Sequence, residues 1–447
     1  MKPFTRAPQL EALYGAPVEV FRKVARVAHL LDDSGYLHWQ SLKYKQPPSD
    51  LTPDQWWLAL KLKRSFGQIE FPTLTAKDGT HLRVTRHARL DAGFARMDRL
   101  IGGQVAMPEA ARNEATRDQF IASSLMEEAI HSSLFEGAVS TREAAKELLR
   151  SDRRPINRDE RMIVNNYRAM LRIREMAKSD LTVDCLLELH KILTDGTLKD
   201  PSQAGRFQRD GEQRVQVIDD RLHRVVHVPP PAGELQERIE RLVAFANEED
   251  IVGEYYVHPV LRSILLHFQL AYDHPFWDGN GRTARALFYW SMLRRGYWLA
   301  EYISISRLLY KNRSGYEEAY LQVESDAQDG TYFVLQQLTV LEAAVDELFE
   351  YVNRKSQAQR QLRLVLNKRD DLNHRQLALL GHALKNPTGI YTHESHGNSH
   401  RVSVMTARAD LLALVDRGWL TKSRSGKRFI YRPAPELERL LAPAKGQ

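Results

Sequence analysis

The residues best suited to chemistry gather in one short segment, HPFWDGNGRTAR, which runs from His274 to Arg285. His274 is its one side chain that titrates near neutral pH, and it is therefore the natural general base. Asp278 supplies hard carboxylate oxygens, the ligand type that Mg²⁺ prefers beside a polyphosphate. The segment thus pairs a base with a metal ligand.

Phosphate binding is the second property of this segment. Gly279 and Gly281 allow successive backbone amides to turn into a concave cluster of donors. The helix that follows offers its N-terminal amides, and Arg282 and Arg285 add permanent charges with bidentate donors. The loop is therefore suited to hold several phosphate oxygens.

Two helical stretches must position this loop, VHPVLRSILLHFQLAYD before it and ALFYWSMLRRG after it. The preceding helix excludes a dinucleotide-binding reading of Gly279 to Ala284, because the G-x-G-x-x-G/A fingerprint must follow a strand. A calcium loop starting at Asp278 also fails, because its twelfth position is Tyr289 where a bidentate Glu is required.

The segment resembles, at every defining position, the signature H-x-F-x-D/E-G-N-G-R-x-x-R of the Fic family of nucleotidyltransferases. The preceding helix, the LHKIL segment at Leu189 to Leu193 and a hairpin that ends in HVPPP are also similar to their Fic counterparts. The resemblance covers roughly residues 112–330. It implies transfer of AMP from ATP to a Ser, Thr or Tyr hydroxyl of a target protein.

The same resemblance implies a role for each motif residue. His274 deprotonates the target hydroxyl, Asp278 holds Mg²⁺, and Phe276 anchors the loop. The α-phosphate lies against Asn280 and the amides of Gly279 and Gly281. The β- and γ-phosphates are held by Arg282 and Arg285.

A second segment, SSLFEG from Ser132 to Gly137, resembles the inhibitory motif S/T-x-x-x-E-G/N of Fic proteins. The resemblance implies that Glu136 pairs with Arg285 where the γ-phosphate would bind, so that the isolated protein is weakly active. In some relatives this glutamate also helps to remove AMP from the target, and the sequence leaves that open.

Two short β runs, VQVI and RVVHV, predict a hairpin on either side of Asp219-Asp220-Arg221. By resemblance this hairpin is a flap that pins the target peptide by strand addition, with Val217 or Ile218 near its working edge. One position departs from the family, since Gln208 stands where an Arg is frequent.

The basic charge of the chain lies at its C-terminal end. The 447 residues carry a net charge of +7, and residues 368–432 alone hold twelve basic and five acidic residues, which accounts for all of it. The segment from Asn373 to Pro433 resembles a winged-helix DNA-binding module. By that resemblance Arg401 and Arg408 face DNA, while Lys422, Arg424, Lys427 and Arg428 contact phosphates from the wing.

The chain is expected to be mainly α-helical, as a Fic helical domain with a β-hairpin flap plus a C-terminal winged helix-turn-helix domain. The expected boundaries are an N-terminal region over 1–111, a catalytic domain with its inhibitory helix over 112–360, and the winged helix over 361–447. The aromatic runs Tyr255-Tyr256 and Phe288-Tyr289-Trp290 are expected in the core, and THESHGNSH, with three histidines, is typical of a polar loop.

No stretch is apolar enough to cross a membrane and the start of the chain lacks a secretion signal, so we expect a cytoplasmic location. The single cysteine forms no intrachain disulfide. The predicted function is protein adenylyltransferase with ATP and Mg²⁺, acting on a protein target, and a homodimer is compatible with the sequence. The alternatives are a DNA-binding regulator with an ATP-sensing Fic site, or a Fic enzyme that removes AMP.

Overall fold

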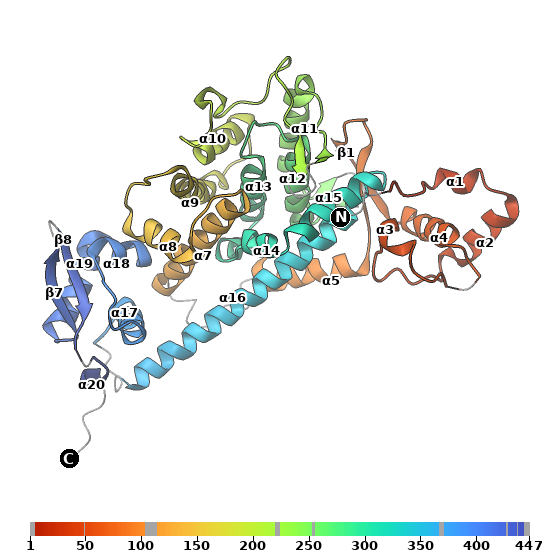
Figure 1. Cartoon of the computed structure of the whole chain (residues 1–447). Helices are drawn as coiled ribbons and strands as arrows, with labels where there is room; N and C mark the ends of the chain where they lie inside the picture. The colour runs from red at the N-terminus through yellow and green to blue at the C-terminus, as the bar shows by residue number, and fades with distance from the viewer. Residues whose placement is uncertain are drawn as a thin grey trace. The chain divides into compact units, whose positions relative to one another are not determined.

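The computed structural model describes residues 5–48, 50–102, 114–219, 224–252, 255–365, 371–425, 428–435 and 437–441. The chain divides into two compact units (Figure 1). The first comprises Met1–Gly102, Arg168–Ala300 and Ile305–Ala343, and the second comprises Gly103–Tyr167, Glu301–Ser304 and Ala344–Gln447. The expected boundary at 111/112 lies outside the described residues.

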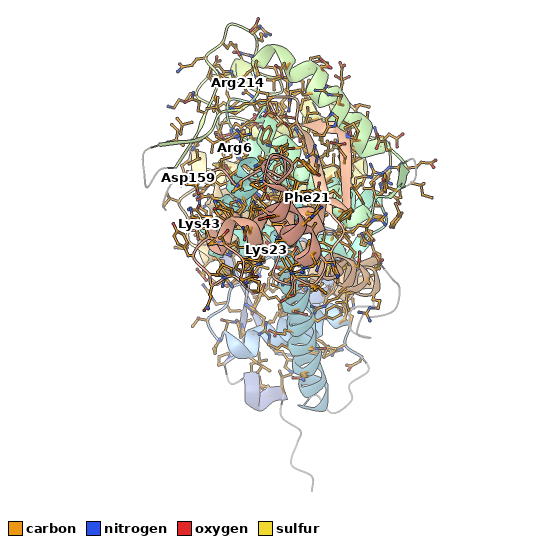
Figure 2. All side chains as sticks on the ribbon, turned by 90° about the vertical axis from the view of Figure 1, so that its right-hand side faces the viewer. Arg6, Phe21, Lys23, Lys43, Asp159 and Arg214 are labelled. Atoms are coloured by element: carbon orange, nitrogen blue, oxygen red, sulfur yellow. The ribbon has the colours of Figure 1, made fainter. Side chains whose placement is uncertain are left out.

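The first unit begins with a small helical cluster. Helix α4 starts at a capping box in which Thr52 and Gln55 bond reciprocally and Pro53 takes the first helical position. Trp57 is its largest fully buried side chain. Phe21 and Lys23 lie on the second helix (Figure 2). The four helices are α1 Glu11–Tyr14, α2 Val18–Ala28, α3 Trp39–Leu42 and α4 Pro53–Ser65.

A hairpin and a helix follow this cluster. Strands β1 (Gln68–Thr75) and β2 (His81–Thr85) pair antiparallel. Helix α5 (Ala88–Met97) then begins behind His87, whose ring nitrogen accepts from the Arg89 amide, and continues into a π-helical turn over Asp98–Gly102.

The central helices of the first unit hold the motif. Helix α12 (Pro259–Asp273) begins behind His258 and is buried along almost all of its length. Helix α13 (Asn280–Arg294) packs beside it (Figure 1), and a hydrogen bond of 2.8 Å joins Ser263 Oγ to Ser291 Oγ.

The other elements of the first unit surround this pair. They are α10 Val183–Thr194, β3 Val217–Asp219, β4 Arg224–His227, α11 Leu235–Asn247, β5 Ile251–Val252, β6 Tyr255–Tyr256, α14 Ile305–Lys311, α15 Arg313–Ser325 and short 3-10 turns at Pro201–Gln203 and Ala232–Glu234. Helices α9 (Arg158–Met176) and α16 (Thr331–Val365) and the 3-10 turn Trp298–Tyr302 have residues in both units.

The described residues of the second unit include two clusters of buried side chains. In the first, helices α7 (Glu114–Phe135) and α8 (Arg142–Ser151) pack with the start of α9 around Ile130 and Ile163. The second cluster lies around Leu380, Leu411 and Tyr431. Its elements are α17 His374–Lys385, α18 His393–His400, α19 Val404–Asp416, β7 Leu420–Ser425, β8 Arg428–Pro433 and α20 Leu437–Leu441.

The expectation of a polar loop at THESHGNSH is wrong, because these residues form α18. Thr392 and Ser395 make a capping box that starts the helix. His396, Gly397 and His400 are buried, and the helix packs on α7, α8 and α19 within the second unit. Tertiary burial thus fixes a helix in a segment whose composition is weakly helix-forming.

Along the described stretches of the chain, no helix is long and apolar enough to cross a membrane.

Candidate active site

His274 occupies the C-terminal end of α12. Its backbone adopts the left-handed conformation, with φ 47°, and its amide donates to the Leu270 carbonyl at 3.0 Å. Nδ1 lies 3.2 Å from the Ala271 carbonyl oxygen. Because a carbonyl only accepts, Nδ1 carries the proton, and in the neutral imidazole Nε2 then carries the lone pair, as a general base requires.

The carbonyls at the end of α12 accept hydrogen bonds from the segment that leads into and out of the hairpin. Arg214 Nη1 donates to the His274 carbonyl at 2.8 Å, and Nη2 donates to that of Asp273. His227 Nε2 lies 2.7 Å from the Tyr272 carbonyl. The Gln208 amide donates to Pro275 at 2.9 Å. These backbone oxygens, which a helix end leaves without intrahelical donors, are thus satisfied by one neighbouring segment.

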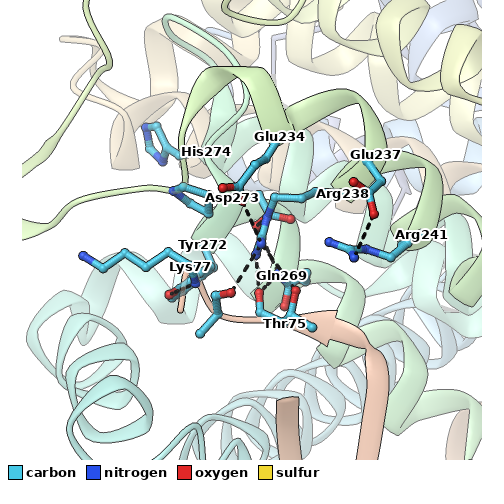
Figure 3. Close-up of polar contacts among 12 residues, drawn as sticks. Thr75, Lys77, Glu234, Glu237, Arg238, Arg241, Gln269, Tyr272, Asp273 and His274 are labelled. Carbon is cyan, nitrogen blue, oxygen red and sulfur yellow. Dashed lines mark hydrogen bonds and ion pairs between the residues drawn. The ribbon is translucent and has the colours of Figure 1, made fainter. Parts of the chain in front are cut away.

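A buried ion pair joins the same helix end to α11. Arg238 Nε on α11 donates to Asp273 Oδ1 at 2.8 Å, and both side chains are almost fully buried. Gln269 donates to the same oxygen at 3.0 Å, and Arg238 also donates to the backbone of Thr75 in β1. Figure 3 shows this cluster, with the His274 side chain pointing away from it.

The loop after His274 is closed by Asn280. Its Oδ1 accepts from the Phe276 amide at 2.9 Å, and its Nδ2 donates to the Phe276 carbonyl at 2.8 Å. Phe276 itself is fully buried, as expected of a loop anchor. The polar groups of Asn280 are therefore used to close the loop, and its assignment to the α-phosphate stays a prediction.

His190 on α10 is a supporting residue that the sequence analysis missed. Its ring stacks on Phe276 with centroids 3.7 Å apart. Nδ1 accepts from the Gly205 amide at 3.0 Å, so Nε2 carries the proton and donates to the Asp278 carbonyl at 2.9 Å. Burial lowers the pKa of His190 to about 4, and the imidazole is neutral at physiological pH.

Gly279 is required where the loop meets α13. Its φ is 84°, and a Cβ at this position would lie 2.9 Å from Thr194 Cγ2. Glycine therefore meets both a conformational and a steric demand. The first amides of α13, which include that of Gly281, have no acceptor within the helix, and their assignment to phosphate stays a prediction.

Asp278 and Arg282 interact with each other. Arg282 Nη2 lies 3.1 Å from Asp278 Oδ1, and Nη1 donates to the Leu193 carbonyl at the end of α10. Asp278 Oδ1 also accepts from the Gly279 amide at 2.5 Å. The Asp278 side chain is 38% exposed and that of Arg282 is fully buried.

Arg285 lies one turn further along α13 and is buried. Burial and the charge of Arg285 lower the pKa of His267 on α12 to about 3. His267 Nε2 lies 3.0 Å from the Tyr316 hydroxyl. The charge of the guanidinium therefore acts on a neutral, hydrogen-bonded histidine.

Strands β3 and β4 form the expected hairpin, with Ile218 opposite Val225. Val217 is half-buried and Ile218 is 54% exposed. Among the described residues of this hairpin, Ile218 is therefore the more accessible of the two predicted docking residues. Asp220 and Arg221, expected at its turn, lie outside the described residues.

The segment Ser132–Gly137 ends α7 in the second unit. Gly137 has a φ of 91°, and the Ala138 amide donates to the Ser133 carbonyl at 3.0 Å, which closes the helix end. Ser132 is buried, and Ser133 Oγ accepts from Asn166 Nδ2 at 2.6 Å. Glu136 is half-buried at this helix end.

The predicted DNA-facing residues occupy α18, α19 and the hairpin of strands β7 and β8. Arg408 is exposed on α19, and Arg401 is half-buried at the end of α18. Arg428 is exposed at the start of β8, whereas Lys427 lies outside the described residues.

Comparison with known proteins defines the class of the motif-bearing region. Residues 180–292 match the Fic/DOC family, so this part of the chain is a Fic/DOC domain that spans α10 to α13. Two similar proteins, from Drosophila erecta and Drosophila melanogaster, are named protein adenylyltransferase Fic. Each is 33% identical over 120 residues, which is 27% of this chain and 21% of the relative's length.

Solved structures give weaker similarities. A Fic family protein from Desulfovibrio desulfuricans G20 is 21% identical with a TM-score of 0.49, covering 79% of this chain and 98% of that chain. Fic-1 from C. elegans is 21% identical with a TM-score of 0.45, and the match covers 60% of this chain and 72% of that chain.

Proposed function

We propose that this protein transfers AMP from ATP to a hydroxyl side chain of a target protein. The observation that carries the proposal is the folded loop, in which a histidine with its Nε2 lone pair precedes a glycine-lined helix N-terminus and two arginines. The name of two similar proteins, protein adenylyltransferase Fic, supports the same reaction.

In the proposed reaction the target hydroxyl oxygen attacks the α-phosphorus of ATP. The bond between that phosphorus and the α,β-bridging oxygen breaks, pyrophosphate leaves, and the hydroxyl proton passes to His274 Nε2. Asn280 keeps the loop closed, while the amides at the start of α13 and the guanidinium of Arg285 meet the phosphate charge. Arg282, through Leu193 and Asp278, holds the loop against α10.

The residues present fit a bound Mg²⁺. Magnesium at polyphosphate sites commonly uses one or two carboxylates together with phosphates and waters, and Asp278 supplies a partly exposed carboxylate. No group of three or more candidate ligands was found among the described residues, which a cage made by protein alone would need. Bound there, Mg²⁺ would neutralise phosphate charge.

We also propose that Glu136 inhibits the site by competing with the γ-phosphate for Arg285. A carboxylate and a triphosphate cannot both use one guanidinium. Each 1.4 kcal/mol that favours the glutamate lowers productive binding about tenfold. The ordered helix end at Ser133 and Gly137 supports a fixed position for Glu136 within its own unit.

The test is incorporation of AMP from α-labelled ATP with Mg²⁺, into the protein itself and into cell lysate. Wild type is compared with Glu136→Gly and with His274→Ala, and the exposed residues Glu143 and His29 give the controls Glu143→Gly and His29→Ala. We expect label to rise at least tenfold with Glu136→Gly. His274→Ala in that background should lower it about 10²- to 10⁴-fold, the typical value of general base catalysis.

Two outcomes would overturn parts of this proposal. A rate near that of the parent in His274→Ala would remove the general base assignment. No incorporation by any variant that still binds ATP would reject the transfer reaction. Release of labelled AMP from pre-modified protein would then favour AMP removal, the alternative reaction.

A second candidate, DNA binding, is favoured by a basic and aromatic face in the second unit. Lys422 Nζ lies 4.2 Å from the ring centroid of Phe429, which is 40% exposed. His393 Nε2 lies 2.7 Å from the Tyr431 hydroxyl, and burial together with the charge of Arg408 lowers the pKa of His393. Exposed cations suit the phosphates of a nucleic acid, and the exposed ring of Phe429 suits stacking on a base, whereas Tyr431 is buried.

This second candidate is tested by the salt dependence of binding to a labelled random-sequence duplex. Arg408→Ala should weaken binding and lower the slope of log K against log [salt] by about 1. Arg26→Ala, on an exposed residue of α2, serves as the control. Equal affinities and slopes for wild type and Arg408→Ala would reject this face as the DNA contact.

A further inference from the structure

The hairpin segment holds the backbone of the general base as well as its own strands. Four consecutive carbonyls, from Tyr272 to Pro275, accept from residues 208, 214 and 227. Two of the four bonds come from one guanidinium, that of Arg214, labelled in Figure 2.

Arg214 is unusual because its described partners are all neutral acceptors. Nε donates to the Pro230 carbonyl at 2.7 Å, Nη1 donates to His274 and to Gln208 Oε1, and Nη2 donates to Asp273. Burial lowers the pKa of Arg214 to about 10, so the group remains charged at neutral pH. A cation is therefore held at the C-terminus of α12, where the helix dipole favours positive charge.

The backbone of His274 needs such support. A non-glycine residue in the left-handed region is disfavoured and persists where its surroundings fix it. The Leu270 carbonyl holds the His274 amide, and Arg214 holds the His274 carbonyl, so both backbone polar groups of the residue are bound.

We propose that Arg214 is a positioning residue for the proposed transfer reaction: by bridging the carbonyls of Asp273 and His274 it fixes the orientation of the general base and opposes protonation of its imidazole. Gln208 orients the guanidinium through Oε1, and its own amide continues the series at Pro275. The inference rests on the proposed function for its kinetic readout alone.

The charge effect has a definite sign. The C-terminal carbonyls of α12 favour an imidazolium at His274, whereas the nearby guanidinium disfavours it. Among the described residues, the titratable and charged groups around this helix end include His227, the Arg238–Asp273 pair, Glu234, which lies 3.6 Å from Arg238 Nη1, and Glu324, whose carboxylate lies 2.9 Å from His227 Nδ1. Removal of Arg214 should therefore raise the pH at which His274 titrates.

The experiment compares Arg214→Met and Arg214→Lys with the control Arg209→Met, an exposed arginine of the same segment, all in the Glu136→Gly background. We expect Arg214→Met to lower kcat about 10- to 100-fold, the equivalent of losing a charged group with two hydrogen bonds, with KM for ATP unchanged. The acid limb of the pH–rate profile should move to higher pH by about half a unit. Arg214→Lys should return the acid limb of the pH–rate profile to its wild-type position, because it keeps the positive charge. It should not restore kcat, because one ammonium cannot reproduce the paired donors of the guanidinium.

A second readout does not depend on turnover. NMR titration of histidine-labelled protein, with His274 assigned by its loss in His274→Gln, should show the same upward shift in Arg214→Met and none in Arg209→Met. An unchanged His274 titration with a loss of thermal stability alone would make Arg214 merely structural and overturn the inference. If Glu136→Gly shows no transfer at all, the proposed function fails, and the NMR titration still decides the role of Arg214.

Discussion

Acidification should loosen the active-site loop through His190. Burial lowers the pKa of this imidazole to about 4 in the folded protein, whereas in the unfolded chain the imidazole takes up a proton near its ordinary pKa of 6.5. The unfolded state therefore binds more protons between these values, and the free energy of unfolding falls as the pH falls through this window. With one pKa unit equal to about 1.36 kcal/mol, His190 alone lowers it by about 2 kcal/mol between pH 7 and pH 5.

The assay is urea unfolding of wild type and His190→Gln at pH 7 and pH 5. Glutamine does not titrate, so the decrease in the free energy of unfolding from pH 7 to pH 5 should be about 2 kcal/mol smaller in the variant, whatever its stability at pH 7. Other buried histidines, such as His38 and His267, contribute equally to both proteins and cancel. His29→Gln, at an exposed position, should lose as much as wild type. An equal loss in wild type and His190→Gln would refute this account of His190.

Three further substitutions test the loop and the second unit. Gly279→Ala should destabilise the protein more than Gly211→Ala, because both glycines have a positive φ and only a Cβ at position 279 would meet a neighbouring atom. The left-handed conformation alone costs an alanine about 1–2 kcal/mol at either position. Equal changes in Tm would contradict a steric contribution at Gly279. Asn280→Leu leaves the amide and carbonyl of Phe276 without their partners, at about 1–3 kcal/mol each, which urea unfolding would detect. Asp410→Asn removes the carboxylate that Arg375 and His396 share, so the free energy of unfolding of the second unit should fall by about 3–5 kcal/mol. In wild type these partners hold the pKa of Asp410 well below its usual value, so the free energy of unfolding should fall less below pH 4 in the variant than in wild type. The same dependence on pH in both proteins would contradict this role.

The loop could be predicted from the sequence because its residues are contiguous. His274, Gly279 and Arg285 stand within one motif, and their spacing alone indicates a helix end, a turn and a helix start. His190 and Arg214 could not be predicted in this way, because they lie 88 and 60 residues from their partners in the loop. No local pattern distinguishes them from an ordinary helix histidine and a loop arginine.

The two aromatic runs that the sequence predicts to be core residues differ in their burial. Phe288, Tyr289 and Trp290 lie in the core, as expected from a helix between other helices. The expectation that Tyr255 and Tyr256 are core residues is wrong, because they form a two-residue edge strand with half of their surface exposed. Their aromatic character alone therefore does not predict burial, because the packing of neighbouring elements determines which face of a short strand is covered.

The hairpin of β3 and β4 divides into a part that can be exchanged and a part that cannot. Its middle, where Ile218 faces Val225, is exposed, while Arg214 and His227 at its base hold the end of α12. Engineering of the proposed target recognition should therefore replace the middle strand residues and keep both base residues. Grafting the whole hairpin together with its base from another protein would remove groups that satisfy the helix end, and would change the proposed reaction together with the proposed recognition.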